Sequence, residues 1–404
     1  MKILNINKFH YIAGGAERFY FELSRLLEKK GNTVIPFAMK HEKNFKTKYD
    51  KYFVSKIQTE KSTNIWQSIR TASRFFWSCE AKRKIKKLIK KEKPEVAFLH
   101  NFYHQISPSI LSVLKKNKIK TVLVAHDYGL LSPNKNMFVR GKVYDKICGH
   151  KFLRCISDRC VRNSFSASLI SGLETWWHHS VLNVYRKNID MVICPSKFMY
   201  TKFVQAGWDE KRLIHLPYFI NPLNKNIKKD FNEKYVLYFG RLSTEKGIDV
   251  LINTMQHLPN VNLKIIGSGP EEEKIKLQIE SYHLDNVELL GYKSGEELSS
   301  YISNSSFIVV PSKWYENYPL SILESYSLGV PALVSNMGGL PEIILNKGFL
   351  FNISNEKDLI NKIEYLWKNS RVVQKEGEKV KKFVLNNNNP VEYYKTLINL
   401  VFKP

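Results

Sequence analysis

Short apolar runs alternate with amphipathic stretches along the first half of this chain. Continuous apolar runs, each about as long as a buried strand, occupy residues 2–7, 33–39, 95–100, 120–126 and 191–196. Apolar positions spaced three or four apart predict helices over residues 16–29, roughly 64–91, 108–116 and 197–205. Continuous apolar strands separated by helices are typical of a parallel sheet. We therefore expect an α/β domain over residues 1–220.

The same alternation restarts after a polar, aperiodic stretch at residues 221–234, which we interpret as a linker. Strands are expected at residues 235–239, 262–266, 287–290, 307–310, 332–335 and 349–352, and helices at residues 247–258, 271–282, 295–303, 320–328 and 357–367. They predict a second domain over residues 235–385, and a helix over residues 386–404 is expected to return to the first domain. The predicted architecture is two tandem Rossmann-like, doubly wound domains that face a central crevice, with ligands at the strands' carboxyl ends.

Charged side chains gather where two strands of the second domain are expected to end. Arg241 and Lys246 flank a turn that begins at Gly240 and leads into a helix, as an anion site requires. Glu316 follows another strand, and Glu324 lies on the next helix among apolar residues. We expect the cations to bind a diphosphate, Glu324 to accept ribose hydroxyls and Glu316 to accept those of a transferred sugar. The backbone N–H groups of the intervening residues would bind phosphate oxygens: Asn317, Tyr318, Pro319 and Leu320.

Glycines precede or follow other predicted elements. Gly14 and Gly15 come before the first helix, where a bare backbone lets a phosphate approach. They do not form the Gly-x-Gly-x-x-Gly fingerprint, so a nicotinamide enzyme is not supported. Gly267 and Tyr292 belong to loops at residues 267–270 and 291–293, which we expect to shape the base and sugar pockets. For the first loop, a simple tight turn explains the sequence equally well.

Two histidines end neighbouring strands of the first domain. His100 is followed by Asn101, and His126 by Asp127. A histidine there can hydrogen-bond a sugar hydroxyl or stabilise a charged transition state. We expect this role for His126 and regard the other three residues as candidates for contacting an acceptor. A purely structural role is the alternative, above all for His100.

An insertion at about residues 127–188 interrupts the first domain and is too long for an ordinary connection. It contains Cys148, Cys155 and Cys160, which with His150 could ligate zinc. Their spacings lack the usual Cys-x₂-Cys pairs, so buried or free thiols are the favoured interpretation. No Asp-x-Asp occurs in the chain, and we expect no metal ion at the diphosphate.

The composition bears on partners and compartment. A formal net charge of +26 over 404 residues favours an anionic partner, such as a membrane face, a nucleic acid or a phosphorylated substrate. The alternative is a lysine-rich solvated surface. The chain starts with no signal-peptide pattern and has no run of about 18 apolar residues, so we expect a cytoplasmic protein with reduced cysteines.

Two segments have the composition of an interfacial anchor. Residues 163–185 contain Trp176 and Trp177, and residues 74–93 start with aromatic side chains and continue as a basic helix. We expect these segments to hold the protein on the anionic inner face of the cell membrane. Ordinary packing of both helices is the alternative.

The motifs of the second domain resemble those of the retaining, GT-B-fold glycosyltransferases of family 4. The resemblance rests on Gly-Arg-Leu-Ser-x-Glu-Lys-Gly at residues 240–247, Pro-Ser-x-x-x-Glu-Asn-x-Pro-Leu-x-x-Leu-Glu at residues 311–324, and Gly-Val-Pro at residues 329–331. It implies a UDP- or GDP-sugar donor, no metal and retention at the anomeric carbon. It also places Arg241 and Lys246 on the diphosphate, Glu324 on the ribose, Glu316 on the donor sugar and His126 at its reacting face. The Glu-Asn-Tyr-Pro-Leu variant and the cysteine-containing insertion resemble the branch found in bacterial surface-polysaccharide gene clusters.

The combined expectation is a metal-independent, retaining hexosyltransferase. It would move a sugar from the nucleotide donor to a glycan or a polyprenyl-diphosphate-linked acceptor in envelope polysaccharide assembly, such as capsule or O-antigen. One alternative is a GT-B nucleotide-sugar 2-epimerase, which needs acid–base carboxylates near the sugar's C2. The other is a basic nucleic-acid-binding protein, but the sequence contains no recognisable RNA- or DNA-binding motif, so nucleic acid is not an expected partner.

Overall fold

The computed structural model describes residues 1–56, 74, 76–221 and 233–402, and the chain divides into two compact units. Unit 1 comprises Met1–Val139, Tyr144–Leu216 and Tyr394–Pro404. Unit 2 comprises Arg140–Val143 and Pro217–Tyr393. Most of the stretch predicted as a linker lies outside the described residues. The last helix begins in unit 2 at Pro390, and its residues from Tyr394 onward belong to unit 1.

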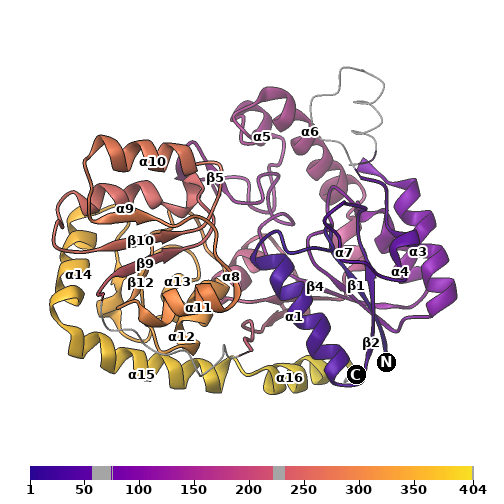
Figure 1. Cartoon of the computed structure of the whole chain (residues 1–404). Coiled ribbons are helices and arrows are strands. Elements are labelled where there is room, and N and C mark those ends of the chain that lie inside the picture. The colour runs from indigo at the N-terminus through magenta and orange to yellow at the C-terminus, as the bar shows by residue number, and fades with distance from the viewer. Residues whose placement is uncertain (57–73, 75, 222–232, 403–404) are drawn as a thin grey trace. The chain divides into compact units, whose positions relative to one another are not determined.

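Unit 1 is built on a parallel six-stranded sheet in the order β2-β1-β3-β4-β7-β8 (Figure 1). The strands are β1 (Lys2–Ile6), β2 (Thr33–Phe37), β3 (Val96–Leu99), β4 (Lys120–Val124), β7 (Met191–Cys194) and β8 (Leu213–His215). Its helices are α1 (Gly15–Lys29), α3 (Cys79–Glu92), α4 (Leu111–Lys116), α5 (Arg154–Ser157), α6 (Phe165–Trp176), α7 (Val184–Asn188) and α8 (Lys197–Gln205). All five strands predicted in the first half are confirmed, and the short β8 is an addition.

The insertion contains its own small elements. A two-stranded ribbon of β5 (Phe138–Val139) and β6 (Lys142–Val143) precedes the helix pair α5 and α6. The end of α6 passes into a π-helical turn at Trp177–Val181. Helix α5 packs on α6 at Gly172, where an added Cβ would lie 3.1 Å from the Ile156 side chain.

Unit 2 repeats the plan with a parallel sheet in the order β11-β10-β9-β12-β13-β14. Its strands are β9 (Val236–Phe239), β10 (Leu263–Ile266), β11 (Val287–Leu289), β12 (Ile308–Val310), β13 (Ala332–Ser335) and β14 (Leu350–Phe351). Its helices are α9 (Ile248–Met255), α10 (Glu272–Ser281), α11 (Gly295–Asn304), α12 (Leu320–Ser327), α13 (Leu340–Ile343), α14 (Glu356–Lys368), α15 (Ser370–Asn387) and α16 (Pro390–Phe402). Helices α9 and α10 cover one face of the sheet, and α11 and α12 cover the other (Figure 1). The predicted doubly wound arrangement is thus confirmed in both units.

Two helix predictions need correction. The single helix expected over residues 64–91 is interrupted before α3, where Ser78 has an extended backbone and its hydroxyl accepts a hydrogen bond from the Ala81 N–H at 3.1 Å. This is an N-cap, so α3 begins at Cys79; residues 64–73 of that prediction lie outside the described part of the chain. Helix α15 was not predicted. Its interior contains Gly377, where glycine is needed because a Cβ would overlap the carbonyl oxygen of Gly329.

Candidate active site

Loops at the carboxyl ends of the unit 2 strands contact one another through main-chain atoms at glycine positions. A Cβ atom at Gly267, after β10, would overlap the carbonyl oxygen of Gly240, after β9. A Cβ atom at Gly247 would overlap the carbonyl oxygen of Pro311, after β12. Gly240, Gly247 and Gly267 also have φ values of 155°, 70° and 149°, which disfavour other residues. The glycines therefore let the loops after three neighbouring strands meet at one edge of the sheet.

The loops after β9 and β12 bring together a cation and a buried carboxylate. The Nζ atom of Lys246 lies 2.6 Å from Oε1 of Glu316, and the Ser312 hydroxyl donates to the same oxygen at 2.6 Å. Only 4% of Glu316 is exposed. Burial alone would raise the pKa of Glu316, but the Lys246 charge and the two hydrogen bonds lower it below its ordinary value. Glu316 is therefore ionised at neutral pH, and Lys246 is its counter-ion.

The Glu316 main chain is fixed as firmly as its side chain. Its carbonyl oxygen accepts a hydrogen bond from the Gly339 N–H at 2.7 Å. A Cβ at the neighbouring Gly338, where φ is 62°, would overlap the same carbonyl oxygen. The loop after β13 thus packs against the main chain of the Glu316 loop.

The other two charged residues of the predicted site differ in exposure. Arg241 is exposed, and within the described residues its guanidinium forms no hydrogen bond or ion pair. Its carbonyl oxygen accepts a hydrogen bond from the buried Tyr238 hydroxyl at 2.9 Å, which anchors the turn after Gly240. Glu324 is the fifth residue of α12 and is 4% exposed, on a helix that is buried from Ile322 to Ser327. Arg241 is therefore accessible to an anion, whereas Glu324 is shielded from bulk water.

The segment that joins Glu316 to α12 packs into unit 2. Its first two residues are buried and the next two are half-buried: Asn317, Tyr318, Pro319 and Leu320. The Tyr318 hydroxyl lies 3.3 Å from the side-chain nitrogen of Asn388, which donates to the Tyr218 carbonyl at 2.6 Å. The Tyr318 side chain is therefore held by the interior of the unit.

The loops expected to shape a base pocket lie side by side. The Gly267 N–H donates to the carbonyl oxygen of Gly291 at 2.8 Å, which joins the loop after β10 to the loop after β11. Tyr292 follows at once and is 70% exposed. Its ring is thus free to pack on a ligand beside Gly267.

In unit 1, the two predicted histidines contact each other. The Nδ1 atom of His100 lies 2.7 Å from Nε2 of His126, and the two rings are stacked with centroids 5.0 Å apart. His100 is completely buried, whereas His126 is half-buried. Burial, and then the charge of Lys8, lowers the pKa of His126 to about 3. Burial, and then His126, also lowers the pKa of His100. Both imidazoles are therefore neutral.

The remaining predicted residues of unit 1 occupy turns. Asn101 is buried, and its main chain bonds to Asn7 and Lys8. Asp127 is half-buried and accepts a hydrogen bond from the Gly129 N–H at 2.9 Å, forming the turn that opens the insertion. Gly14 and Gly15 are exposed at the start of α1, where added Cβ atoms would meet no atom closer than 3.7 Å. Packing does not require glycine at these two positions.

The cysteines of the insertion do not gather around His150. Cys155 and Cys160 form a disulfide in a small apolar cluster with Ile147, so the expectation of reduced thiols is wrong for this pair. Cys148 is free, and burial raises the pKa of its thiol to about 11. Among the described residues, no group of three or more histidine, cysteine or acidic side chains is placed to hold a metal ion.

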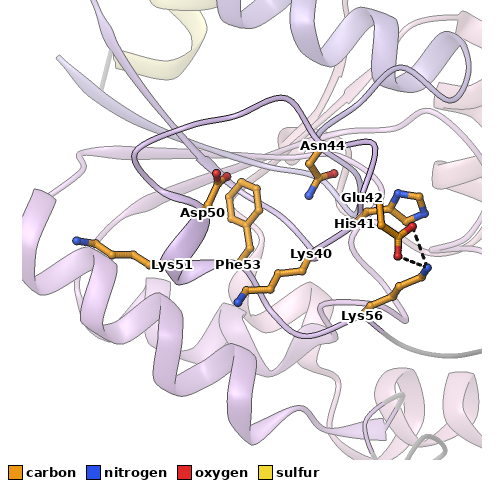
Figure 2. A pocket seen from close by; sticks show the side chains of 8 residues that line it. All are labelled: Lys40, His41, Glu42, Asn44, Asp50, Lys51, Phe53 and Lys56. Carbon is orange, nitrogen blue, oxygen red and sulfur yellow. Dashed lines mark hydrogen bonds and ion pairs between the residues drawn. The ribbon is translucent and has the colours of Figure 1, made fainter.

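A polar cavity of about 460 Å³ adjoins the loop after β2 in unit 1 (Figure 2). Its lining includes Lys40, Lys51 and Lys56, with Glu42 paired to Lys56 at 3.1 Å. No motif pointed to this loop, because its lysines resemble the many solvated lysines elsewhere in the chain. Ser312 was missed for a different reason: it belongs to the Pro-Ser-x-x-x-Glu motif, yet its contact with Glu316 appears only in three dimensions.

Comparison with known proteins agrees with this architecture. The model of Glycosyltransferase Family 4 matches residues 13–222, and that of glycosyl transferases group 1 matches residues 220–384. An uncharacterized glycosyltransferase of Methanocaldococcus jannaschii is 32% identical over 201 residues, which span 48% of this chain and only 55% of that protein. An uncharacterized 42.6 kDa protein in the cps region of Klebsiella pneumoniae is 26% identical over 359 residues, 85% of this chain and 87% of the relative.

The fold also has a solved counterpart. The structure of HepE from Anabaena, in complex with UDP and glucose, superimposes with a TM-score of 0.68 at 15% identity and covers 99% of this chain and 98% of HepE. At this identity the likeness concerns the fold alone, which is the GT-B arrangement of two parallel-sheet α/β domains. Since the first family model matches more than half of the chain, this protein belongs to Glycosyltransferase Family 4.

Proposed function

We propose that the protein is a retaining glycosyltransferase that moves a sugar from a nucleotide-diphosphate-sugar to a glycan or polyprenyl-diphosphate-linked acceptor. Family membership supports transfer over the two alternatives, epimerisation and nucleic-acid binding. The complex of HepE with UDP and glucose supports a uridine donor, with a guanosine donor as the alternative. The relative from the cps region supports a place in envelope polysaccharide assembly.

The observation that carries the proposal is the contact of the half-buried Lys246 and the buried Ser312 with the buried Glu316, together with the exposed Arg241 in the same loop as Lys246. A nucleotide-sugar supplies an anion for the two cations and hydroxyl groups for the carboxylate. In this proposal Arg241 and Lys246 neutralise the charge that grows on the departing diphosphate. Glu316 accepts hydrogen bonds from hydroxyls of the transferred sugar, and Glu324 accepts those of the ribose.

The proposed retention assumes that no side chain among the described residues at the strand ends of unit 2 acts as a nucleophile. Glu316, the carboxylate at the strand ends of unit 2, is already engaged by Lys246 and Ser312. We therefore propose that the acceptor oxygen attacks from the face that the diphosphate leaves, and that His126 hydrogen-bonds a sugar hydroxyl during this step. We propose that Arg241 and Lys246 bind the diphosphate without a metal ion.

A donor screen followed by product analysis tests this function. UDP-, GDP- and ADP-sugars are compared by thermal shift, and we expect one nucleotide class to raise the melting temperature. The anomeric proton coupling of the product, measured by NMR, should match that of the donor, and transfer should persist in EDTA. A product with the opposite anomeric configuration, or activity that returns only with Mg²⁺ or Mn²⁺, would contradict the corresponding part of the proposal.

We propose that the acceptor binds unit 1, where the cavity after β2 is lined by Lys40, Lys51 and the Glu42-paired Lys56. Their ammonium groups suit the diphosphate of a lipid-linked acceptor. Lys40→Gln should raise KM for a diphosphate-linked acceptor several-fold and leave KM for the donor unchanged. Equal KM values for the acceptor in the variant and the wild type would show that the acceptor does not bind at this cavity.

We also propose that the protein binds the inner face of the cell membrane through α6. Six large apolar side chains on α6 and its π-helical end are more than a third exposed: Phe165, Ile170, Leu173, Trp176, Trp177 and Val181. The segment just before the basic helix α3 contacts this region, since the Phe76 carbonyl oxygen lies 2.7 Å from Nε2 of His178. None of the described helices is long and apolar enough to cross a bilayer. Phe75, part of the predicted anchor, lies outside the described residues.

Liposome co-sedimentation tests this surface. The wild type should bind anionic vesicles, release in high salt and bind neutral vesicles weakly. Trp176→Ser combined with Trp177→Ser should reduce binding, whereas Tyr365→Ser, which removes an aromatic ring that is 52% exposed on α14, should not. Equal binding to neutral and anionic vesicles, or binding to neither, would contradict the proposed attachment to an anionic membrane.

A further inference from the structure

Trp314 lies in the loop after β12, at a position that the Pro-Ser-x-x-x-Glu motif leaves open. The Glu316 N–H donates to the Trp314 carbonyl oxygen at 2.9 Å, which closes a three-residue turn. One position earlier, the Lys313 N–H donates to the Glu245 carbonyl oxygen at 2.9 Å and joins this loop to the loop after β9. The main chain on both sides of Trp314 is thus fixed, next to the Lys246 loop and next to Glu316.

The ring of Trp314 packs against the Lys246 ammonium. The Lys246 Nζ lies 5.2 Å from the ring centroid, within the roughly 6 Å over which the face of an aromatic ring attracts a cation. The same Nζ lies 2.6 Å from Oε1 of Glu316. Lys246 therefore has two partners, a carboxylate and an indole ring. It can leave the carboxylate and still be attracted by the ring.

The indole N–H of Trp314 has no hydrogen-bond partner among the described residues, although its Nε1 atom is buried. Burial raises the pKa of the Glu316 carboxyl, whereas Lys246, Ser312 and then this N–H lower it. The indole N–H thus lies close to the carboxylate without forming a hydrogen bond with it. Glu316 already accepts hydrogen bonds from Lys246 and Ser312. A buried donor without an acceptor is unfavourable, so this N–H would gain from a place at the carboxylate.

We propose that Trp314 is a positioning residue that exchanges partners with Lys246 when a diphosphate binds. The ammonium turns from Glu316 to the diphosphate while the ring keeps it within reach, and the indole N–H then donates to the Glu316 carboxylate. A carboxylate that accepts this N–H stays ionised and oriented after its cation has turned away. The diphosphate named here rests on the proposed function, whereas the capacity of the N–H to replace Lys246 is a property of the free protein.

Removing the ammonium tests the exchange without any ligand. The indole protons of the full-length protein are followed by proton–nitrogen NMR, and the Trp314 signal is assigned by its loss in Trp314→Phe. In Lys246→Met the Trp314 proton should move downfield, because it gains a hydrogen bond to Glu316. Adding Glu316→Gln should reduce this shift, since a neutral amide oxygen is a weaker acceptor than a carboxylate. An unchanged or upfield signal in Lys246→Met would overturn the proposal.

Titration of the wild type with UDP and with GDP tests the same exchange in the intact site. Both carry the diphosphate without a sugar, so they draw on Lys246 and leave Glu316 to the indole N–H. The nucleotide that raises the melting temperature should also move the Trp314 proton downfield. Binding without that movement would refute the exchange. If neither nucleotide binds, the proposed function is contradicted, and the signal in Lys246→Met still decides on this inference.

Two variants separate the ring from its N–H. Trp314→Phe keeps an aromatic face for Lys246 and removes the donor, so kcat should fall about three- to tenfold while the donor KM changes little. Trp314→Leu removes both, and the donor KM should rise as well. Trp367→Phe is the matched control, because that ring lies 4.4 Å from the Lys234 ammonium, and it should leave both values unchanged. Wild-type kcat in Trp314→Phe, or equal losses of kcat in Trp314→Phe and Trp367→Phe, would refute the role.

Discussion

Replacing Lys246 by methionine would leave a carboxylate buried without its counter-ion. Glu316 is 4% exposed, and its Oε1 accepts hydrogen bonds from the Lys246 ammonium and the Ser312 hydroxyl, each at 2.6 Å. Removing one partner of a buried ion pair costs about 3–5 kcal/mol. The Lys246 side chain is 24% exposed, so water can replace part of the lost contact. We therefore expect the free energy of unfolding of unit 2 to fall by about 2–3 kcal/mol at pH 7.5, a drop in Tm of about 4–12 °C.

The loss should depend on pH with a definite sign. In the wild type the pKa of Glu316 is lowered, so its stabilisation is present above the ordinary glutamate value of about 4.3 and is lost as the pH falls through the folded pKa. In Lys246→Met, burial without the cation raises that pKa, so stability falls as the pH rises above about 4.3. The difference between the variant and the wild type should therefore be larger at pH 7.5 than at pH 5.

Urea and thermal unfolding at both pH values provide the assay. Adding Glu316→Gln to the variant should restore stability at pH 7.5, because the buried group is then neutral. Lys313→Met is the matched control, since Lys313 pairs at 2.8 Å with Asp249, whose side chain is 40% exposed, and should cost less than about 1 kcal/mol. The reasoning is refuted if both lysine variants lose equal stability, or if the loss is the same at both pH values.

Three other predictions concern ligand binding and packing. Arg241→Ala should leave Tm almost unchanged, because the side chain is exposed, and should lower kcat by about 10²–10³ if it contacts the leaving group as proposed; wild-type turnover would exclude that contact. By calorimetry, Glu324→Gln should weaken binding of the bare nucleoside diphosphate, whereas Glu316→Gln should spare it and reduce transfer; the reverse pattern would exchange the two roles. Gly267→Ala should lower the free energy of unfolding of unit 2 by several kcal/mol, because its Cβ would overlap backbone atoms. In the control Gly14→Ala, the nearest atom to the new Cβ is 3.7 Å away, so the free energy of unfolding should change by less than about 0.5 kcal/mol. Similar losses of stability in both variants would contradict the packing argument.

Hydrophobic periodicity located the sheets because their strands are covered on both faces. It missed β8, since Leu213–His215 is only three residues long and ends in a polar side chain. It also missed α15, where Gly377 is unfavourable for a helix but necessary for contact with the Gly329 backbone. The helix expected before residue 79 failed at Ser78, whose capping role is visible in the sequence only once the helix start is known.

The candidate site was predictable as residue types and not as contacts. The motifs named Lys246 and Glu316, but their ion pair depends on β9 and β12 being neighbours in the sheet, which no local pattern encodes. Tyr318 belongs to the motif, yet its side chain packs against Asn388 in a distant part of the sequence. Asn5 carried an unused signal: a polar residue inside an otherwise apolar strand, buried completely, must have hydrogen-bond partners.

The backbone contacts at Gly247, Gly267 and Gly338 limit the substitutions by which the donor specificity of this protein could change. At these positions evolution has almost no alternatives, because any side chain would displace a neighbouring loop. New donor specificity would therefore come from substitutions at exposed loop positions such as Tyr292, which is 70% exposed and can be replaced without disturbing the sheet. A directed-evolution library aimed at a new donor should accordingly be concentrated on Tyr292 and its loop, and the inner glycines should be left as they are.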